Sequence, residues 1–230
     1  MIRKIHAVWL GSRMPPLAHA CVNDWQKMGF QFHLWTDSER RIQRWINACT
    51  FAKKCFELGL YAFVSDYLRL KILQEEGGLY LDTDVTILRD PFPLFQDLKF
   101  VIGHETGEFL GTAAIYAEPD SQILSELVDF YEHGIWKSPL YIGPQIATDL
   151  IKHQKLCEVE PCGLLPMKAF YPYQQEAIWF DFPSESYLVH WFQHSWKHSP
   201  SMNFLKAKHL GLLGKVYVWQ KYFFRRLLRF

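Results

Sequence analysis

Two aspartates separated by one residue are the part of this sequence best suited to chemistry. Asp82 and Asp84 follow the apolar segment 79–81. In an extended strand, side chains two positions apart project from the same face, so both carboxylates would point the same way. Two oxygen ligands placed in this way suit Mg²⁺ or Mn²⁺, which proteins often hold through one or two carboxylates together with substrate phosphates. The spacing therefore predicts a site for a divalent ion and a diphosphate.

A predicted helix over residues 63–76 carries a second charged pair just before these aspartates. Asp66 and Arg69 are three positions apart and therefore share a helix face. Gly77 and Gly78 can turn the helix tightly into the following strand. One interpretation of the pair is a local helix salt bridge, which contributes only about 0.3 to 0.5 kcal/mol. The other, which the short turn favours, is that both side chains reach the end of the strand where the aspartates lie.

Short apolar segments alternate with helical ones, a pattern typical of an α/β domain with a mostly parallel or mixed sheet. We predict strands at 5–10, 31–35, 79–81, 99–103, 112–116 and 186–190, and helices at 17–28, 39–58, 63–76, 121–133 and 143–152. No repeat or linker divides this stretch. We therefore expect one domain over residues 1–201, followed by a C-terminal helical extension over residues 202–230.

The charge of the chain is distributed unevenly. The whole sequence has 25 Lys and Arg against 24 Asp and Glu, yet residues 186–230 contain 8 basic residues and no acidic one. On a helix with about 100° per residue, the basic residues from Lys215 onward share one arc, and apolar and aromatic residues fill much of the rest. This pattern is typical of a helix lying on an anionic membrane surface. The alternative is a terminal helix that packs its apolar side on the domain.

Composition excludes several classes of protein. A hydrophobic fraction of 49% with 21% charged residues argues against disorder, and no apolar run is long enough for a transmembrane helix. The start of the chain does not resemble a signal peptide, and no nucleic-acid-binding motif accompanies the basic segment. Five cysteines, an odd number without a Cys-x-x-Cys pair, predict neither a disulfide framework nor a zinc site, and favour a reducing cytosol.

The central residues also resemble a known family. Ser65-Asp66-x-x-Arg69, followed by Gly77-Gly78-x-Tyr80-x-Asp82-x-Asp84, is similar to the sugar-donor motif of the Asp-x-Asp glycosyltransferases of family 32, relatives of the large glucosylating bacterial toxins. Matching segments at 5–11, 34–37, 143–144, 170–172 and 190–196 occur in the expected order. The resemblance spans roughly residues 5–196 and implies a GT-A-like fold, in which helices flank a Rossmann-like mixed sheet.

The resemblance implies a role for each matching residue. Asp84 and Asp82 are expected to hold the metal, with Asp82 also facing the ribose and the sugar. Asp66 and Arg69 resemble residues that hold sugar hydroxyls and diphosphate oxygens. Trp9 resembles the aromatic residue that stacks on uracil, although a tryptophan at the end of a strand can equally belong to the core. The remaining residues expected at the donor site are Ser65, Tyr80, Gly143, Ser195 and Trp196.

His190 resembles the first residue of a family signature that usually reads His-His-Trp-x-x-Ser-Trp. Trp191 and Phe192 replace its second His and its Trp here, so no role carries over for a second histidine. His190 is a candidate for the third metal ligand or for a phosphate contact. The spacing of His190, His194 and His198 also fits one helix face and a zinc site, but no cysteine or acidic partner is nearby.

The function implied is a retaining glycosyltransferase that depends on Mn²⁺ or Mg²⁺. The donor would be a nucleotide-sugar, UDP-hexose or UDP-HexNAc, and the acceptor a hydroxyl of a glycan or lipid-linked oligosaccharide in cell-surface polysaccharide or capsule biosynthesis. Loops at 105–111 and 139–143 would shape the acceptor side. We expect a cytoplasmic bacterial enzyme that is peripheral on the inner face of the cytoplasmic membrane.

Other classes of protein share parts of this pattern. The run 82–86 also fits the Asp-x-Asp-x-Thr start of haloacid-dehalogenase-type phosphatases, with Asp82 as nucleophile. That class places the motif on its first strand and adds a later acidic pair, and neither feature is evident. An EF-hand loop is excluded because Ile87 stands where glycine is required. The non-enzymatic alternative is a membrane-surface binding module whose Asp-x-Asp is incidental.

Overall fold

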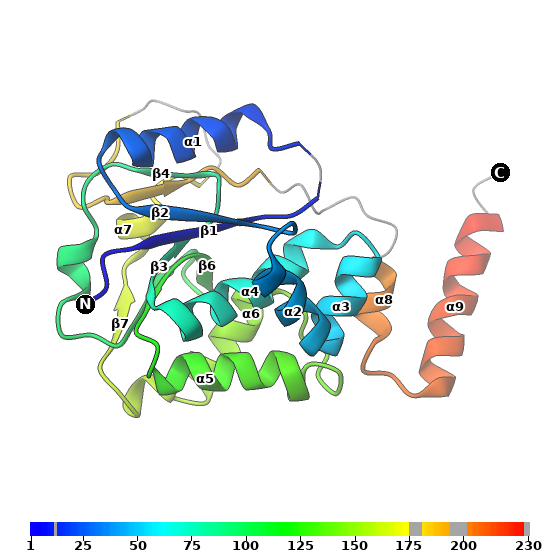
Figure 1. Ribbon diagram of the computed structural model, residues 1–230. Helices are drawn as coiled ribbons and strands as arrows, with labels where there is room; N and C mark the ends of the chain where they lie inside the picture. Colours follow the sequence, from blue (N-terminus) through cyan, green and yellow to red (C-terminus); the bar gives the residue numbers. More distant parts are fainter. Residues whose placement is uncertain (12, 175–180, 194–201, 228–230) are drawn as a thin grey trace.

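A six-stranded sheet forms the centre of the computed structural model, which describes residues 1–11, 13–174, 181–193 and 202–227 (Figure 1). The strand order is β2-β1-β3-β6-β5-β7. All neighbouring strands are parallel except β6, which runs antiparallel to both β3 and β5. The bounds are β1 (Ile5–Trp9), β2 (Phe32–Thr36), β3 (Gly78–Leu81), β5 (Phe100–His104), β6 (Leu110–Ala117) and β7 (Cys162–Leu165). A second, two-stranded antiparallel sheet pairs β4 (Val85–Ile87) with β8 (Leu188–His190).

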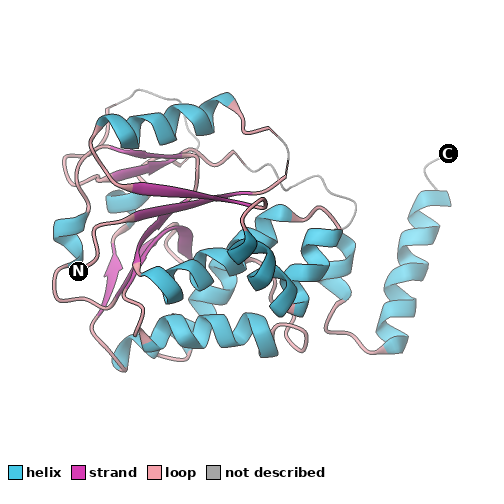
Figure 2. Cartoon of the chain, in the orientation of Figure 1, coloured by secondary structure: helices cyan, strands magenta, loops and turns pink. Residues whose placement is uncertain are grey.

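Helices cover both sides of the strands, as Figure 2 shows. They are α1 (Pro16–Lys27), α2 (Arg40–Ala48), α3 (Thr50–Glu57), α4 (Tyr61–Glu76), α5 (Gln122–Asp129), α6 (Gly143–Thr148), α7 (Met167–Phe170), α8 (Met202–Ala207) and α9 (Leu212–Leu227). Short helical turns span Phe92–Phe95, Phe130–Gly134, Asp149–His153 and Leu156–Glu158. None of the helices in the described part of the chain combines the length and apolar character needed to cross a bilayer.

The apolar core has two layers because the inner strands β1, β3, β5 and β6 are buried on both faces. Ile5 and Ala7 of β1 pack with Trp25 of α1 in one layer, whereas Val8 packs in the other layer with residues of α2 to α6. Successive side chains on a strand alternate between faces, so a strand covered on both faces must be apolar almost throughout. This is why β3 and β6, which are buried throughout, consist almost entirely of apolar residues.

The mixed α/β architecture predicted from the sequence is confirmed, and the differences are local. Strands β4 and β7, of three and four residues, were not predicted. The helix predicted over 39–58 is divided at Cys49, whose backbone is extended (φ −95°, ψ 112°). The extension predicted as one helix over 202–230 forms two helices, α8 and α9, because a turn in which the Leu210 amide donates to the carbonyl of Ala207 separates them.

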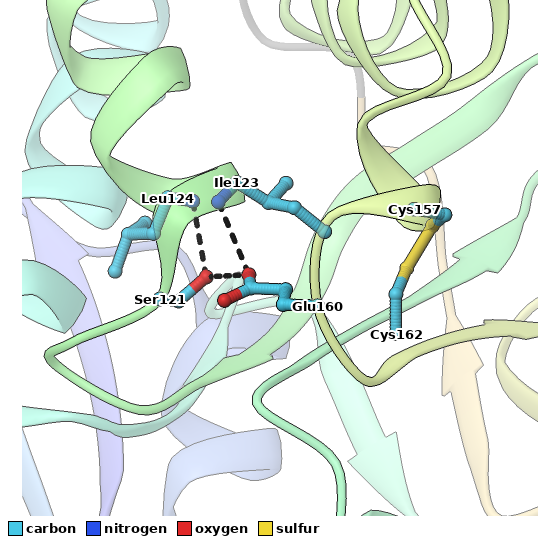
Figure 3. The surroundings of a disulfide bond; sticks show 6 residues. All are labelled: Ser121, Ile123, Leu124, Cys157, Glu160 and Cys162. Atoms are coloured by element: carbon cyan, nitrogen blue, oxygen red, sulfur yellow. Dashed lines mark hydrogen bonds between the residues drawn. A yellow bond between two sulfur atoms is a disulfide. The ribbon is translucent and has the colours of Figure 1, made fainter.

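The cysteine prediction was wrong for one pair. Cys157 and Cys162 form a disulfide, with their Cα atoms 5.3 Å apart (Figure 3). The loop that they close carries Glu160, whose carboxylate accepts hydrogen bonds from the hydroxyl of Ser121 and the amide of Ile123 at the start of α5. The pairing depends on how the chain turns into β7, which neither the number nor the spacing of cysteines reveals. The other three cysteines are buried and free.

The predicted glycine turn joins α4 to β3. Gly77 and Gly78 both have positive φ angles, 64° and 102°, which glycine adopts without steric cost. His6 of β1 holds this turn, because its Nε2 lies 3.0 Å from the carbonyl oxygen of Gly77. Its Nδ1 accepts a hydrogen bond of 3.1 Å from the indole N–H of Trp35. Since an indole nitrogen only donates, the His6 ring is neutral and carries its proton on Nε2.

This arrangement predicts acid sensitivity of the fold. Burial, with a smaller effect from the Lys4 cation, lowers the pKa of His6 to about 4. The unfolded chain takes up the proton near pH 6.5 and the folded chain only near pH 4, so stability is lost as the pH falls through this window. Between pH 7 and pH 4.5 we expect His6 to account for about 2 to 3 kcal/mol of the loss in unfolding free energy.

Urea unfolding at the two pH values measures this effect. The control is His6→Gln, which retains a donor and an acceptor but does not titrate. Between pH 7 and pH 4.5, the unfolding free energy of this variant should fall by about 2 to 3 kcal/mol less than that of the wild type. Equal pH dependence in both proteins would show that His6 does not cause the acid sensitivity.

Candidate functional site

A cavity of about 590 Å³ opens at the carboxyl ends of β1 and β3. This volume is within the range of about 300 to 1,000 Å³ typical of small-molecule sites. Helix α4, the β5–β6 loop, the start of α6 and the residues after β8 complete its wall. The predicted site residues that line it are Trp9, Ser65, Asp66, Arg69, Tyr80, Asp82, Asp84 and His190. Segments far apart in the sequence therefore meet in one place.

The Asp-x-Asp motif lies in a turn and not on a strand. β3 pairs with β6 as far as Leu81, and the chain then turns so that β4 can pair with β8 in the second sheet. Within the turn the amide of Val85 donates to the carbonyl of Asp82 over 3.1 Å. The prediction that an extended strand places both carboxylates on one face was therefore wrong. The turn, and not an extended strand, brings the two carboxylates together.

Asp82, Asp84 and His190 converge. Each offers a ligand atom, and these atoms lie within 4.8 Å of one another. His190 arrives from β8, where it is paired in register with Val85, the residue directly after the motif. Its Nε2 is 3.4 Å from Oδ1 of Asp84, whose Oδ2 accepts a hydrogen bond of 3.0 Å from the amide of Gln193. Pairing between β4 and β8 therefore assembles this group.

The electrostatics of the group fit a cation. Burial opposes protonation of His190, but the hydrogen bond and charge of Asp84 outweigh it and raise the pKa of the imidazole. The pKa of Asp84 is lowered, since the His190 contact and the Gln193 amide overcome the effect of burial. Nδ1 of His190 is buried with no hydrogen-bond partner among the described residues, whereas most buried polar atoms have one. Two carboxylates and an imidazole suit a divalent ion.

Arg69 lines the cavity but is only 5% exposed. Its Nη2 is 3.0 Å from Oδ1 of Asp66 and 3.3 Å from Oδ1 of Asp82. Nε donates to the carbonyl of Ser65, and Nη1 donates to the carbonyl of Thr112. In this structure the guanidinium thus forms ion pairs with the carboxylates of Asp66 and Asp82. The Asp66–Arg69 pair exists as a helix salt bridge, but its burial takes it outside the range of surface pairs.

Two further predicted residues, Gly143 and Tyr80, donate hydrogen bonds to these carboxylates. The amide of Gly143 donates to Oδ2 of Asp66 over 3.2 Å, and a Cβ at this position would lie 2.7 Å from Oδ1 of the same residue. Only glycine permits this approach. The hydroxyl of Tyr80 donates to Oδ1 of Asp82 over 2.9 Å. Burial raises the pKa of Asp66 to about 6, with Arg69 acting in the opposite direction.

Glu105 is a residue of the cavity wall to which sequence reasoning assigned no role. It lies in the β5–β6 loop, where its amide donates to the carbonyl of Phe109 over 2.9 Å. Burial raises the pKa of its carboxyl, and the charges that act on it belong to His190, Asp82 and other residues of the site. No motif marks this position. Its place at the end of β5, beside the other carboxyl-terminal strand ends, was the available signal.

Some predicted residues fall outside the described part of the chain. Ser195 and Trp196, expected at the donor site, lie within the segment 194–201, which the structure does not describe. His194 and His198 of the alternative zinc arrangement lie there too. Trp9 lines the cavity at the end of β1 and is partly buried, which leaves its side chain accessible from the cavity.

Comparison with known proteins relates part of this chain to the glycosyltransferases. Residues 14–103 match the family described as "Glycosyltransferase sugar-binding region containing DXD motif". This span contains Asp66, Arg69 and both aspartates of the motif. This part of the chain is therefore similar to the sugar-binding region of the DXD glycosyltransferases, and the resemblance seen in its motifs is confirmed.

The chain is also similar over part of its length to two named proteins. The chain is 26% identical over 162 residues to "Subversion of eukaryotic traffic protein A" of Legionella pneumophila. It is 30% identical over 124 residues to "Lactosylceramide 4-alpha-galactosyltransferase" of Homo sapiens. These alignments cover 57% and 49% of this chain but only 25% and 33% of the two proteins. The chain thus spans about a quarter to a third of the length of these relatives.

A solved structure supports the fold. "PaToxG Glycosyltransferase" superposes with a TM-score of 0.51 and 18% sequence identity, covering 68% of this chain and 73% of that one. At this identity the likeness concerns the architecture. It agrees with the helix-flanked mixed sheet described above.

Arg69 should be essential for stability because it neutralises two partly buried carboxylates. Arg69→Met leaves Asp66 and Asp82 without their cation, and we expect the free energy of unfolding to fall by about 3 to 5 kcal/mol. The matched control is Lys54→Met, which removes an i,i+3 helix pair of 3.1 Å with Glu57 whose side chains are about half exposed; its cost should be within about 1 kcal/mol. Urea unfolding measures both, and equal losses would contradict the role given to Arg69.

Proposed function

We propose that this chain is a metal-dependent retaining glycosyltransferase that uses a nucleotide-sugar donor, UDP-hexose or UDP-HexNAc. The observation that carries the proposal is the convergence of Asp82, Asp84 and His190 in the wall of a cavity of about 590 Å³. Two of these residues belong to the part of the chain that matches the DXD sugar-binding region. A nucleotide-sugar is a diphosphate, which is the ligand that a divalent ion and two carboxylates bind together.

Asp82, Asp84 and His190 would hold Mn²⁺ or Mg²⁺. When bound, such an ion stabilises negative charge on a departing diphosphate. The protein contributes a site that is already organised: Arg69 and Tyr80 fix one oxygen of Asp82, and the Gln193 amide fixes one oxygen of Asp84. Preorganised charges of this kind supply a large part of catalysis, because they need no rearrangement as the leaving group departs.

The donor would lie along the cavity from β1 towards α6. Trp9 at the end of β1 offers a ring face for the nucleobase. Asp66 is held by Arg69 and the Gly143 amide, and it lines the cavity as an acceptor for sugar hydroxyls. Arg69 acts as a positioning residue, since its nitrogens are engaged by protein oxygens. Together these residues would orient the anomeric carbon.

Glu105 is placed to act on the acceptor. It lies in the cavity wall on the loop after β5, whereas the motif carboxylates lie after β3. A carboxylate whose pKa is raised towards the working pH can accept the proton of an attacking hydroxyl. We assign Glu105 this role, with the acceptor entering from the β5–β6 loop.

We propose as acceptor a hydroxyl of a glycan or lipid-linked oligosaccharide in cell-surface polysaccharide biosynthesis, at the inner face of a bacterial cytoplasmic membrane. A relative whose name specifies lactosylceramide supports a lipid-linked acceptor. The phosphatase alternative has less support, because the Asp-x-Asp motif follows the third strand along the chain and one oxygen of Asp82 is engaged by both Arg69 and Tyr80.

Loss of Asp84 should abolish metal-dependent activity while the fold is kept. We expect Asp84→Asn to lower Mn²⁺-dependent hydrolysis of UDP-sugars by more than the roughly 100-fold that loss of an outer-shell partner costs. Mn²⁺ affinity, measured by calorimetry, should fall as well. The control is Asp129→Asn, which alters a carboxylate that is 65% exposed and remote from the cavity. Wild-type hydrolysis by Asp84→Asn would refute the metal site.

Glu105→Gln should affect the chemical step and not donor binding. We expect kcat for UDP-sugar hydrolysis to fall by about 100-fold or more, with UDP affinity in the presence of Mn²⁺ unchanged. In the wild type, kcat should rise with pH through a pKa above the usual value for Glu, because the base must be ionised, and this limb should disappear in the variant. Glu108→Gln, an exposed residue of the same loop, is the control. A reduced UDP affinity with unchanged kcat would contradict the role.

A further inference from the structure

The C-terminal helix α9 has a wide apolar face that no described part of the chain covers. Leu212, Val216, Trp219 and Phe223 follow one another along a single side of the helix, and they are 80%, 45%, 62% and 47% exposed. The rings of Trp219 and Phe223 stack with their centroids 5.5 Å apart. An exposed stripe of this length is uncommon on a soluble surface and marks a binding face.

The helix is not packed on the domain, which settles one alternative raised by the sequence. Its principal neighbour is α8, and Figure 1 shows it standing apart from the sheet and the helices around it. The preceding segment is the part that anchors to the domain: Leu205 is fully buried in the core, and Nζ of Lys208 donates to the carbonyls of Ile135 and Ser138. The chain is therefore anchored to the domain as far as Lys208, and the exposed helix begins after Gly211.

The sequence of α9 opposes this apolar face with positive charge. At about 100° per residue, Lys215, Lys221 and Arg225 fall on an arc opposite or beside the stripe. No acidic residue occurs anywhere in residues 186–230, whereas residues 1–185 carry 17 basic against 24 acidic side chains. An anionic surface would thus attract α9 and repel the body of the protein, which fixes the orientation of approach.

We propose that α9 lies in the interface of an anionic lipid bilayer, with its apolar stripe in the acyl boundary and its lysines and arginines at the headgroups. Apolar width, interfacial aromatic residues and a cationic arc together define such a helix. A second copy of the chain fits less well, because two helices of the same positive sign would meet. This inference goes beyond the proposed sugar transfer and does not depend on it.

Co-sedimentation with vesicles tests the proposal. The full chain should bind vesicles of phosphatidylcholine with 30% phosphatidylglycerol, and binding should weaken in high salt because screening acts on the charges. Reversal of two cations, Lys221→Glu with Arg225→Glu, should lower the partition coefficient by at least about 25-fold, taking about fivefold for each cation. The matched control is Arg44→Glu with Lys53→Glu, two exposed cations of α2 and α3, which should change binding by less than twofold.

A second variant tests the apolar face. Trp219→Ser with Phe223→Ser should abolish vesicle binding while the melting temperature and donor hydrolysis stay at wild-type values, because these side chains do not pack in the core. Size-exclusion chromatography with light scattering reports the competing outcome. A dimer that these two substitutions dissociate, or equal binding to anionic and purely zwitterionic vesicles, would overturn the proposal.

Discussion

The buried guanidinium of Arg69 is the interaction on which the rest of the site depends. It joins Asp66 of α4 to Asp82 at the end of β3, 3.0 and 3.3 Å away. Two carboxylates brought this close and partly buried would repel each other, and a cation between them offsets this repulsion. Arg69 can occupy this position because the Gly77–Gly78 turn folds α4 back against the strand that it precedes. A helix, a turn and a strand thus form one electrostatic unit.

A second constraint is the pairing of β4 with β8. The register that places Val85 opposite His190 sets the imidazole beside Asp84, across more than 100 residues of sequence. Because the two-stranded sheet begins directly after the Asp-x-Asp turn, small changes in that turn would move all three ligands. The β4–β8 pairing therefore holds His190 in position, as the Arg69 guanidinium holds Asp66 and Asp82. Rigid elements, and not the loops alone, hold the groups proposed to bind the donor.

Charge is also divided at the level of the whole chain. The body holds the carboxylates that a cation and a diphosphate require, and the terminal helix holds the excess of positive charge. Burial of Leu205 and Lys208 anchors the chain to the domain before α9 begins. The helix α9 therefore stays exposed and does not pack in the core. A transferase with this layout would have its donor site and its surface anchor on separate elements.

The sequence by itself determined the fold class, the glycine turn, the family resemblance and the main carboxylates, because each follows from local patterns: apolar periodicity, positive φ angles that need glycine, and a short motif. It could not decide what depends on contacts between distant segments. Tertiary structure alone showed that the motif forms a turn, that Arg69 is buried between two carboxylates, and that Glu105 shares their cavity. It also paired Cys157 with Cys162 and left α9 uncovered. The physical reason is that burial and charge neutralisation are properties of packed neighbours, which spacing along the chain does not encode.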